Sequence, residues 1–150
     1  MIGISPGTRS IGTAIFKEGE LKDWGTKIFK EKWSATKLAR ILNNIEACIK
    51  MYNISCIIIK CPHGSRTSEG LDEVTKGIII IAKRLRIPYK QYSIEELKYL
   101  CNGANTKQSL MNFVLSHYPE VGKTIKPSKR NKKYHMKTIE SVALVHVRNQ

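Results

Sequence analysis

The sequence predicts an α/β fold, with a mixed five-stranded sheet of a three-stranded antiparallel meander and two parallel strands, flanked by helices. Two observations predict it. Three strand-like segments joined by short turns open the chain, since "GISPGTRSIGTAIF" breaks at a proline and a glycine and another turn follows at Gly19. Strands then alternate with amphipathic helices, an order that produces parallel strands with helices on both faces. We expect a single domain over residues 1–150.

Each predicted element has a local signal. Ser34 is a good N-cap residue, and the apolar residues after it repeat at helical spacing from Leu38 to Ile49. The unbroken β-branched run in "SCIIIKC" is typical of a central strand covered on both faces. Acidic residues suit the positive end of the following helix, which Pro88 ends. The predicted strands are residues 2–5, 10–16, 21–31, 55–61 and 88–93, and the predicted helices are residues 34–53, 71–87, 93–101, 105–118 and 134–148.

The charge of the chain is its first functional signal. There are 26 basic and 12 acidic residues, which give a formal net charge of +14. This excess favours nucleic acid as the partner, because neutralising phosphates releases counterions and supplies affinity that does not depend on base sequence. A basic surface that is merely solvated is the alternative. We expect no membrane partner, because there is no long basic amphipathic helix and no apolar run of roughly 20 residues.

The start of the sequence and its cysteines lead us to expect a cytoplasmic protein. Met1 leads directly into strand-like sequence without a signal segment. The four cysteines form no CxxC pair, and free thiols in a reducing compartment are the simplest interpretation. A zinc site formed by Cys56, Cys61 and His63 is the alternative, although this spacing is not that of a common zinc module.

Three separated segments carry a further signal. They are "GISPGTRSIGTAIF", "GIIIIAKRLRIPYKQYSIEELKYLCNGANTKQSL" and "IESVALVH". In this order they resemble the RuvC-type Holliday junction resolvases of the ribonuclease H-like superfamily: the opening glycine-isoleucine-aspartate-proline-glycine strand, the helix and strand that lead into a basic helix, and the last helix. The resemblance implies the fold predicted above. It also implies a homodimer, because a four-way junction presents two equivalent cutting positions.

The chain departs from this family at its metal site. Resolvases of the family hold two magnesium ions with four carboxylates, and these ions activate a water for phosphodiester hydrolysis. By resemblance, the four catalytic positions fall on Ser5, Lys60, Lys137 and Glu140, so only Glu140 remains a carboxylate. An ammonium group repels a dication and offers no lone pair. We therefore expect neither metal nor cofactor, and an ion pair between Lys137 and Glu140, which lie three residues apart on a predicted helix.

Other residues near these positions are expected to bind nucleic acid. They follow the first strand and the central strand, open the predicted helix 105–118, and form the basic stretch before the last helix. Tyr134 and His135 are candidates for stacking on an exposed base. The candidate binding residues are Thr8, Arg9, Ser10, His63, Ser65, Arg66, Asn105, Thr106, Lys107, Lys129, Arg130, Lys132 and Lys133.

The functional prediction is a RuvC-like protein that recognises branched or structured DNA through its phosphates and whose nuclease activity is lost or impaired. Two alternatives stay open. One is a magnesium-dependent Holliday junction or other structure-specific endonuclease with an altered set of ligands. The other is a non-catalytic scaffold that pairs with an active relative.

Overall fold

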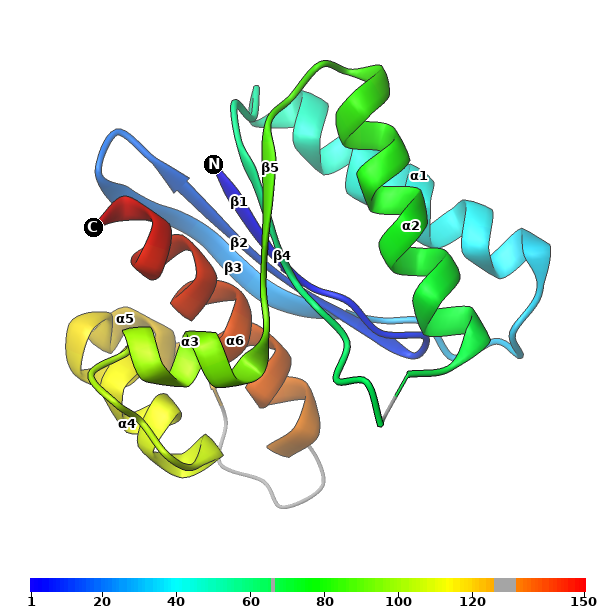
Figure 1. Ribbon diagram of the computed structural model, residues 1–150. Coiled ribbons are helices and arrows are strands. Elements are labelled where there is room, and N and C mark those ends of the chain that lie inside the picture. The colour runs from blue at the N-terminus through cyan, green and yellow to red at the C-terminus, as the bar shows by residue number, and fades with distance from the viewer. Residues whose placement is uncertain (66, 126–131) are drawn as a thin grey trace.

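The computed structural model describes residues 1–65, 67–125 and 132–150, and a five-stranded sheet forms its centre (Figure 1). The strands are β1 (Ile2–Ser5), β2 (Ser10–Lys17), β3 (Glu20–Ile28), β4 (Ile57–Lys60) and β5 (Tyr89–Tyr92). Their order across the sheet is β3-β2-β1-β4-β5. The first three strands form an antiparallel meander, whereas β4 lies parallel to both β1 and β5. The predicted mixed sheet is confirmed.

Helices cover both faces of this sheet (Figure 1). On one face lie α1 (Ala35–Met51) and α2 (Glu69–Arg84), which pack against each other. On the other lie α3 (Ile94–Leu100), α4 (Lys107–His117), α5 (Pro119–Thr124) and α6 (Lys132–Asn149). Among these helices, none is both long and apolar enough to cross a membrane within the part of the chain that the structure describes.

The core has two halves, one on each face of the sheet. Alternation along β4 divides its side chains between them. Ile57 and Ile59 join the half under α1 and α2, together with Ile78, while Ile58 joins the half under α6, together with Val142. All five side chains are fully buried. The strand is therefore covered on both faces, as its β-branched run predicts.

Some boundaries differ from the predicted ones for local reasons. Helix α2 begins at Glu69, two residues earlier than predicted, because the Ser68 side chain accepts a hydrogen bond from the Leu71 amide and caps the helix. It ends at Arg84, and the chain leaves the helix through Arg86, whose φ is +55°. Helix α5 was not predicted, and a proline stands at its first position, where the missing amide hydrogen is no loss.

Helix α6 lies directly on the backbone of β1 and β2. A Cβ atom on Gly3 would lie 2.3 Å from the carbonyl oxygen of Ser141, and one on Gly12 would lie 2.1 Å from that of Lys137. Both distances are too short for any other residue, so glycine is required at both positions. The close approach fixes the helix along the strands and brings Glu140 to the carboxyl end of β1.

We expect Gly12→Ala to destabilise the protein by roughly 2–3 kcal/mol, because the new methyl group forces the α6 backbone away from β2. Gly25→Ala on β3 is the matched control: no atom lies within 4 Å of its added Cβ, and we expect a change within about 0.5 kcal/mol. Chemical denaturation followed by circular dichroism measures both. Equal stability of the two variants would contradict the close approach.

Candidate functional site

The ends of two neighbouring parallel strands meet α6 at Glu140. Ser5 is the last residue of β1, and Lys60 is the last residue of β4. The Oγ of Ser5 and the Nζ of Lys60 each donate a hydrogen bond to Oε2 of Glu140, at 2.6 Å. The side chains of Lys60 and Glu140 are only 16% and 5% exposed, and Ser5 is fully buried. These residues therefore form a buried ion pair reinforced by a hydroxyl group.

The surroundings of Glu140 keep its carboxylate ionised. Burial alone raises the pKa of Glu140, but the charge of Lys60 and the hydrogen bonds from Lys60 and Ser5 outweigh it and hold the pKa below its usual value. A paired carboxylate of this kind is stable only while its partner is present, because a lone charge in the interior is poorly solvated. Glu140 and Lys60 therefore depend on each other.

Lys137 lies nearly one turn before Glu140 on α6 and has a different partner. Its Nζ donates a hydrogen bond to the carbonyl oxygen of Pro6 at 2.5 Å. Burial and the nearby charges of Lys60 and Lys107 lower the pKa of Lys137 to about 8, although Glu140 opposes the shift. The predicted ion pair between Lys137 and Glu140 is wrong. Lys60 takes that place because the end of β4 brings its ammonium group directly to the carboxylate.

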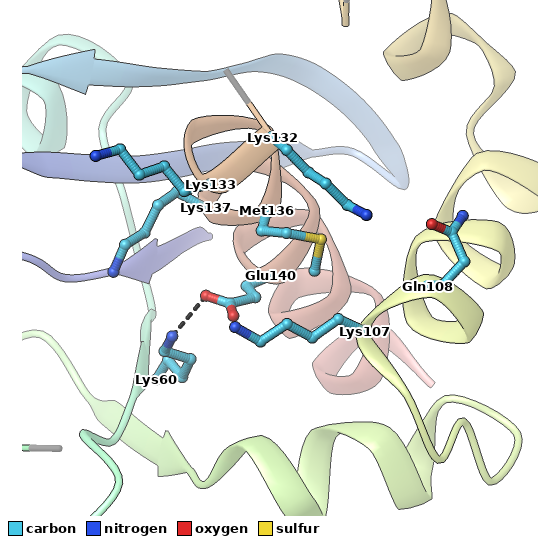
Figure 2. Close-up of a pocket in the computed structure, with 8 residues that line it drawn as sticks. All are labelled: Lys60, Lys107, Gln108, Lys132, Lys133, Met136, Lys137 and Glu140. Atoms are coloured by element: carbon cyan, nitrogen blue, oxygen red, sulfur yellow. Dashed lines mark hydrogen bonds and ion pairs between the residues drawn. The ribbon is translucent and has the colours of Figure 1, made fainter. Parts of the chain in front are cut away.

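These residues open into a strongly cationic cleft between β4, α4 and α6 (Figure 2). Its volume is about 700 Å³, and among the described residues five lysines line it with a single carboxylate, which Lys60 already neutralises. A neighbouring cavity of about 200 Å³ shares four of these residues and extends to His63. Such a cleft suits an anionic oxygen, because the fixed positive charges of the ammonium groups attract it. The residues lining the main cleft are Lys60, Lys107, Gln108, Lys132, Lys133, Met136, Lys137 and Glu140.

The same residues do not fit a magnesium ion. Magnesium takes oxygen ligands in nearly octahedral geometry, usually including one or two carboxylates. Here the carboxylate of the cleft accepts two hydrogen bonds on one oxygen, and one of them comes from an ammonium group 2.6 Å away. Within residues 1–65, 67–125 and 132–150, no group of three or more histidine, cysteine or acidic residues is placed to hold a metal.

The zinc alternative at Cys56, Cys61 and His63 is wrong for the same reason, since these three described residues form no such group. His63 instead has two polar neighbours. Its Nδ1 shares a 2.6 Å hydrogen bond with the hydroxyl group of Ser65, and its Nε2 lies 3.6 Å from Oε1 of Glu95. Both cysteines are free thiols.

The structure brings some of the predicted binding residues together. Lys107, Lys132 and Lys133 line the cleft, and His63 lines the adjoining cavity. Thr106 caps α4 by accepting a hydrogen bond from the Ser109 amide at 3.0 Å, and Asn105 is exposed just before it. Three further predicted residues, Arg66, Lys129 and Arg130, lie outside the described residues.

Other predicted residues lie elsewhere. Thr8 and Arg9 line a second pocket together with Tyr134, and Ser10 is buried at the start of β2. Gln108, one of the residues that open α4, also lines the cleft, whereas Met136 was not predicted to do so. Tyr134, a predicted stacking residue, lines the second pocket with Arg9. Phe29, Lys30, Lys32 and Trp33 were not predicted there, although the stretch "KIFKEKW" interleaves lysines with aromatics, a pattern typical of single-strand binding surfaces.

Comparisons with known proteins identify this architecture. No family model and no curated protein sequence matches the chain. Among solved structures it is similar to RuvC from Thermus thermophilus, with a TM-score of 0.74 at 13% identity over 99% of this chain and 95% of that one. The same enzyme in complex with a Holliday junction substrate gives 0.74 at 14% identity, over 98% and 92% of the two chains. The yeast mitochondrial Holliday junction resolvase Ydc2 gives 0.68 at 12% identity, over 97% and 75%.

These similarities establish the fold. The chain has the RuvC-type, ribonuclease H-like fold, as the resemblance of its three segments predicts. The likeness extends over nearly the whole chain, so the meander, the parallel strands and the last helix are all included.

We expect Lys60→Met to destabilise the protein by roughly 3–5 kcal/mol at neutral pH, because it leaves Glu140 charged, buried and without its cation. The double variant Lys60→Met/Glu140→Gln should recover much of this loss, because no charge is left uncompensated. Denaturant unfolding of the wild type, both single variants and the double variant measures the coupling. Additive effects in this cycle would contradict the buried ion pair.

The same variants have a defined pH dependence. In the wild type the pKa of Glu140 is lowered in the folded state, so its contribution to stability is present at neutral pH and is lost as the pH falls through that folded pKa. In Lys60→Met only burial and the Ser5 and Lys137 interactions remain, and burial, the largest influence, opposes ionisation. As the pH falls, the wild type should therefore lose more of its free energy of unfolding than Lys60→Met does. The difference in stability between the two proteins should become smaller.

Proposed function

We propose that the protein binds branched DNA, such as a four-way junction, through its phosphates and does not cleave it. One observation carries the proposal: the strand ends of a RuvC-type fold open into a lysine-lined cleft whose single carboxylate is neutralised by Lys60. The 150 residues act as one domain in this proposal.

The charge of the cleft supports binding to a phosphate backbone. Lys107 comes from α4 and Lys132 and Lys133 come from α6, and the half-buried Lys60 and Lys137 complete the lining (Figure 2). Ammonium groups neutralise neighbouring phosphates and release counterions, whichever bases are present. The formal net charge of +14 adds long-range attraction to any nucleic acid.

The structure of Thermus thermophilus RuvC with a Holliday junction substrate supports branched DNA as the ligand. That protein shares the fold of this chain over 98% of its length. A homodimer is part of the proposal, because a four-way junction offers two equivalent binding positions related by a two-fold axis.

The loss of cleavage is supported by ligand chemistry. Metal-dependent phosphodiester hydrolysis requires ions that activate water and stabilise the leaving oxygen. The resemblance implies metal ligands at four positions. Lys60 and Lys137 occupy two of them, and Ser5, whose hydroxyl donates a hydrogen bond to Glu140, occupies a third. We propose that fixed ammonium groups bind the phosphate in place of the metal ions.

The test is incubation of the purified protein with a labelled four-way junction and a matched duplex, with magnesium, manganese or chelator. Native gels should show binding that prefers the junction and does not need metal, and denaturing gels should show no cuts. Metal-dependent cuts that Glu140→Gln abolishes would overturn the proposal in favour of an active nuclease. Binding no stronger than that of a generic basic protein would favour the scaffold alternative.

Charge reversal at the cleft locates the binding site. We expect Lys107→Glu/Lys132→Glu to weaken junction binding by more than tenfold and to make the salt dependence less steep, because two phosphate contacts are lost. Both side chains are exposed, so the fold should tolerate the changes. Lys50→Glu/Lys83→Glu, on the helices of the opposite face, is the charge-matched control and should retain far more affinity. Equal losses in the two double variants would contradict a localised site.

Lys137 makes binding depend on pH. With a pKa of about 8, it loses its proton as the pH rises through that value, and the cleft loses one positive charge. At constant ionic strength, affinity for DNA should therefore fall over this range. Lys137→Met should bind more weakly below this pKa and show no such decline. A wild-type affinity that stays constant through this range would contradict a role for Lys137 in phosphate binding.

A further inference from the structure

A second pocket lies beside the cationic cleft and has a different character. Its volume is about 560 Å³, within the range of small-ligand sites, roughly 300–1,000 Å³. Three separate parts of the chain form it: the turn after β1, the connection from β3 to α1, and the first turn of α6. Its walls carry both aromatic rings and cations.

We infer that this pocket holds an unpaired nucleotide of the bound nucleic acid, with its base against Trp33 and its phosphate near Arg9, Lys30 and Lys32. The inference rests on the proposed function, since it concerns a further site on the same ligand. Because the pocket holds an unpaired nucleotide, the protein distinguishes nucleic acid with single-stranded or extruded nucleotides from continuous duplex.

The aromatic side chains support a base as the occupant. Trp33 remains 38% exposed at the pocket, so part of its ring is accessible to a ligand. Its ring is held from behind, because a Cβ atom on Gly70 would lie only 3.0 Å from Cε2 of Trp33. Tyr134 adds a second aromatic ring to the lining, and Phe29 lies buried beneath. A flat, supported ring is a stacking platform for any base.

The charges of the pocket support a phosphate beside that base. Glu31 is the acidic residue of the lining, and its carboxylate is paired with Arg40 at 2.6 Å. The buried Lys37 donates its Nζ to the carbonyl oxygen of Glu31 at 2.7 Å and thereby holds the loop in place. The remaining cations, Arg9, Lys30 and Lys32, are exposed and take part in no salt bridge within the described parts of the chain.

The position of the pocket connects it to the cleft. Tyr134 lines the pocket, while Lys133, the residue before it, lines the cleft. The two side chains touch, since Nζ of Lys133 lies 5.0 Å from the centre of the Tyr134 ring. A strand whose phosphates follow the cleft lysines therefore reaches the second pocket across the first turn of α6. A base inside a duplex is stacked on both faces and does not offer itself to Trp33, whereas an unpaired base does.

Two ligands test the inference: a blunt duplex, and the same duplex with a short single-stranded tail. We expect the tail to strengthen binding by roughly 5- to 100-fold, the effect of one aromatic stacking contact. Trp33→Ala should reduce the affinity for the tailed duplex to that for the blunt one. Trp24→Phe is the control for loss of a tryptophan, because Trp24 lies outside this pocket and donates its Nε1 to Thr124; it should preserve the preference for the tail.

A second readout does not depend on the folding of Trp33→Ala. The chain has two tryptophans, so in Trp24→Phe the emission comes from Trp33 alone. The tailed duplex should quench this emission, and the blunt duplex should leave it unchanged. Equal affinity for both ligands with unquenched emission would overturn the inference, as would equal quenching by both.

The two proposals fail in different ways. If DNA binds and Lys107→Glu/Lys132→Glu weakens it, but the tail has no effect, then only the second pocket is refuted and the proposed function stands. If neither duplex nor junction binds, the proposed function fails and the inference fails with it.

Discussion

The close contact between α6 and the backbones of β1 and β2 is the constraint on which the site depends. Gly3 and Gly12 leave no Cβ between the helix and the strands, so the helix axis approaches the sheet more closely than side chains would allow. This distance brings Glu140 to the ends of β1 and β4, where Ser5 and Lys60 reach it. The buried core on both sides of β4 holds the strand ends rigidly against it. The geometry of the cleft therefore depends on this contact between the backbones of α6 and the two strands.

The buried ion pair then decides the electrostatics of the cleft. Glu140 neutralises Lys60, and the described part of the lining holds no further carboxylate for its other four lysines. Burial, and to a smaller extent the neighbouring charges of Lys60 and Lys107, lower the pKa of Lys137 to about 8. A site of this kind attracts an anion and repels a dication. In a metal-dependent nuclease, metal ions at these strand ends bind the phosphate. In our proposal, the strand ends of this protein bind phosphate without metal.

The first turn of α6 links this cleft to the aromatic pocket. Lys133 lines the cleft and Tyr134 lines the pocket, so in our proposal consecutive residues have two different recognition roles. Phosphate contacts position a nucleic acid without reading its structure, whereas stacking on Trp33 requires a base that is free of its neighbours. In our proposal, this combination would make the protein select branched or partly single-stranded ligands without any contact to base edges.

The order of strands and helices, the mixed sheet and the doubly covered central strand were predictable from the sequence, because apolar periodicity and turn residues act locally. The sequence also shows that positions 60 and 137, at which the resemblance implies metal ligands, hold lysines. The partners of these two lysines could not be predicted from the sequence. Spacing along α6 favoured Lys137 for Glu140, yet Lys60 from a distant strand pairs with it, and Lys137 turns to Pro6. The pocket around Trp33 likewise joins three distant segments. Such contacts depend on how closely the helix packs on the sheet, a distance that only the tertiary structure decides.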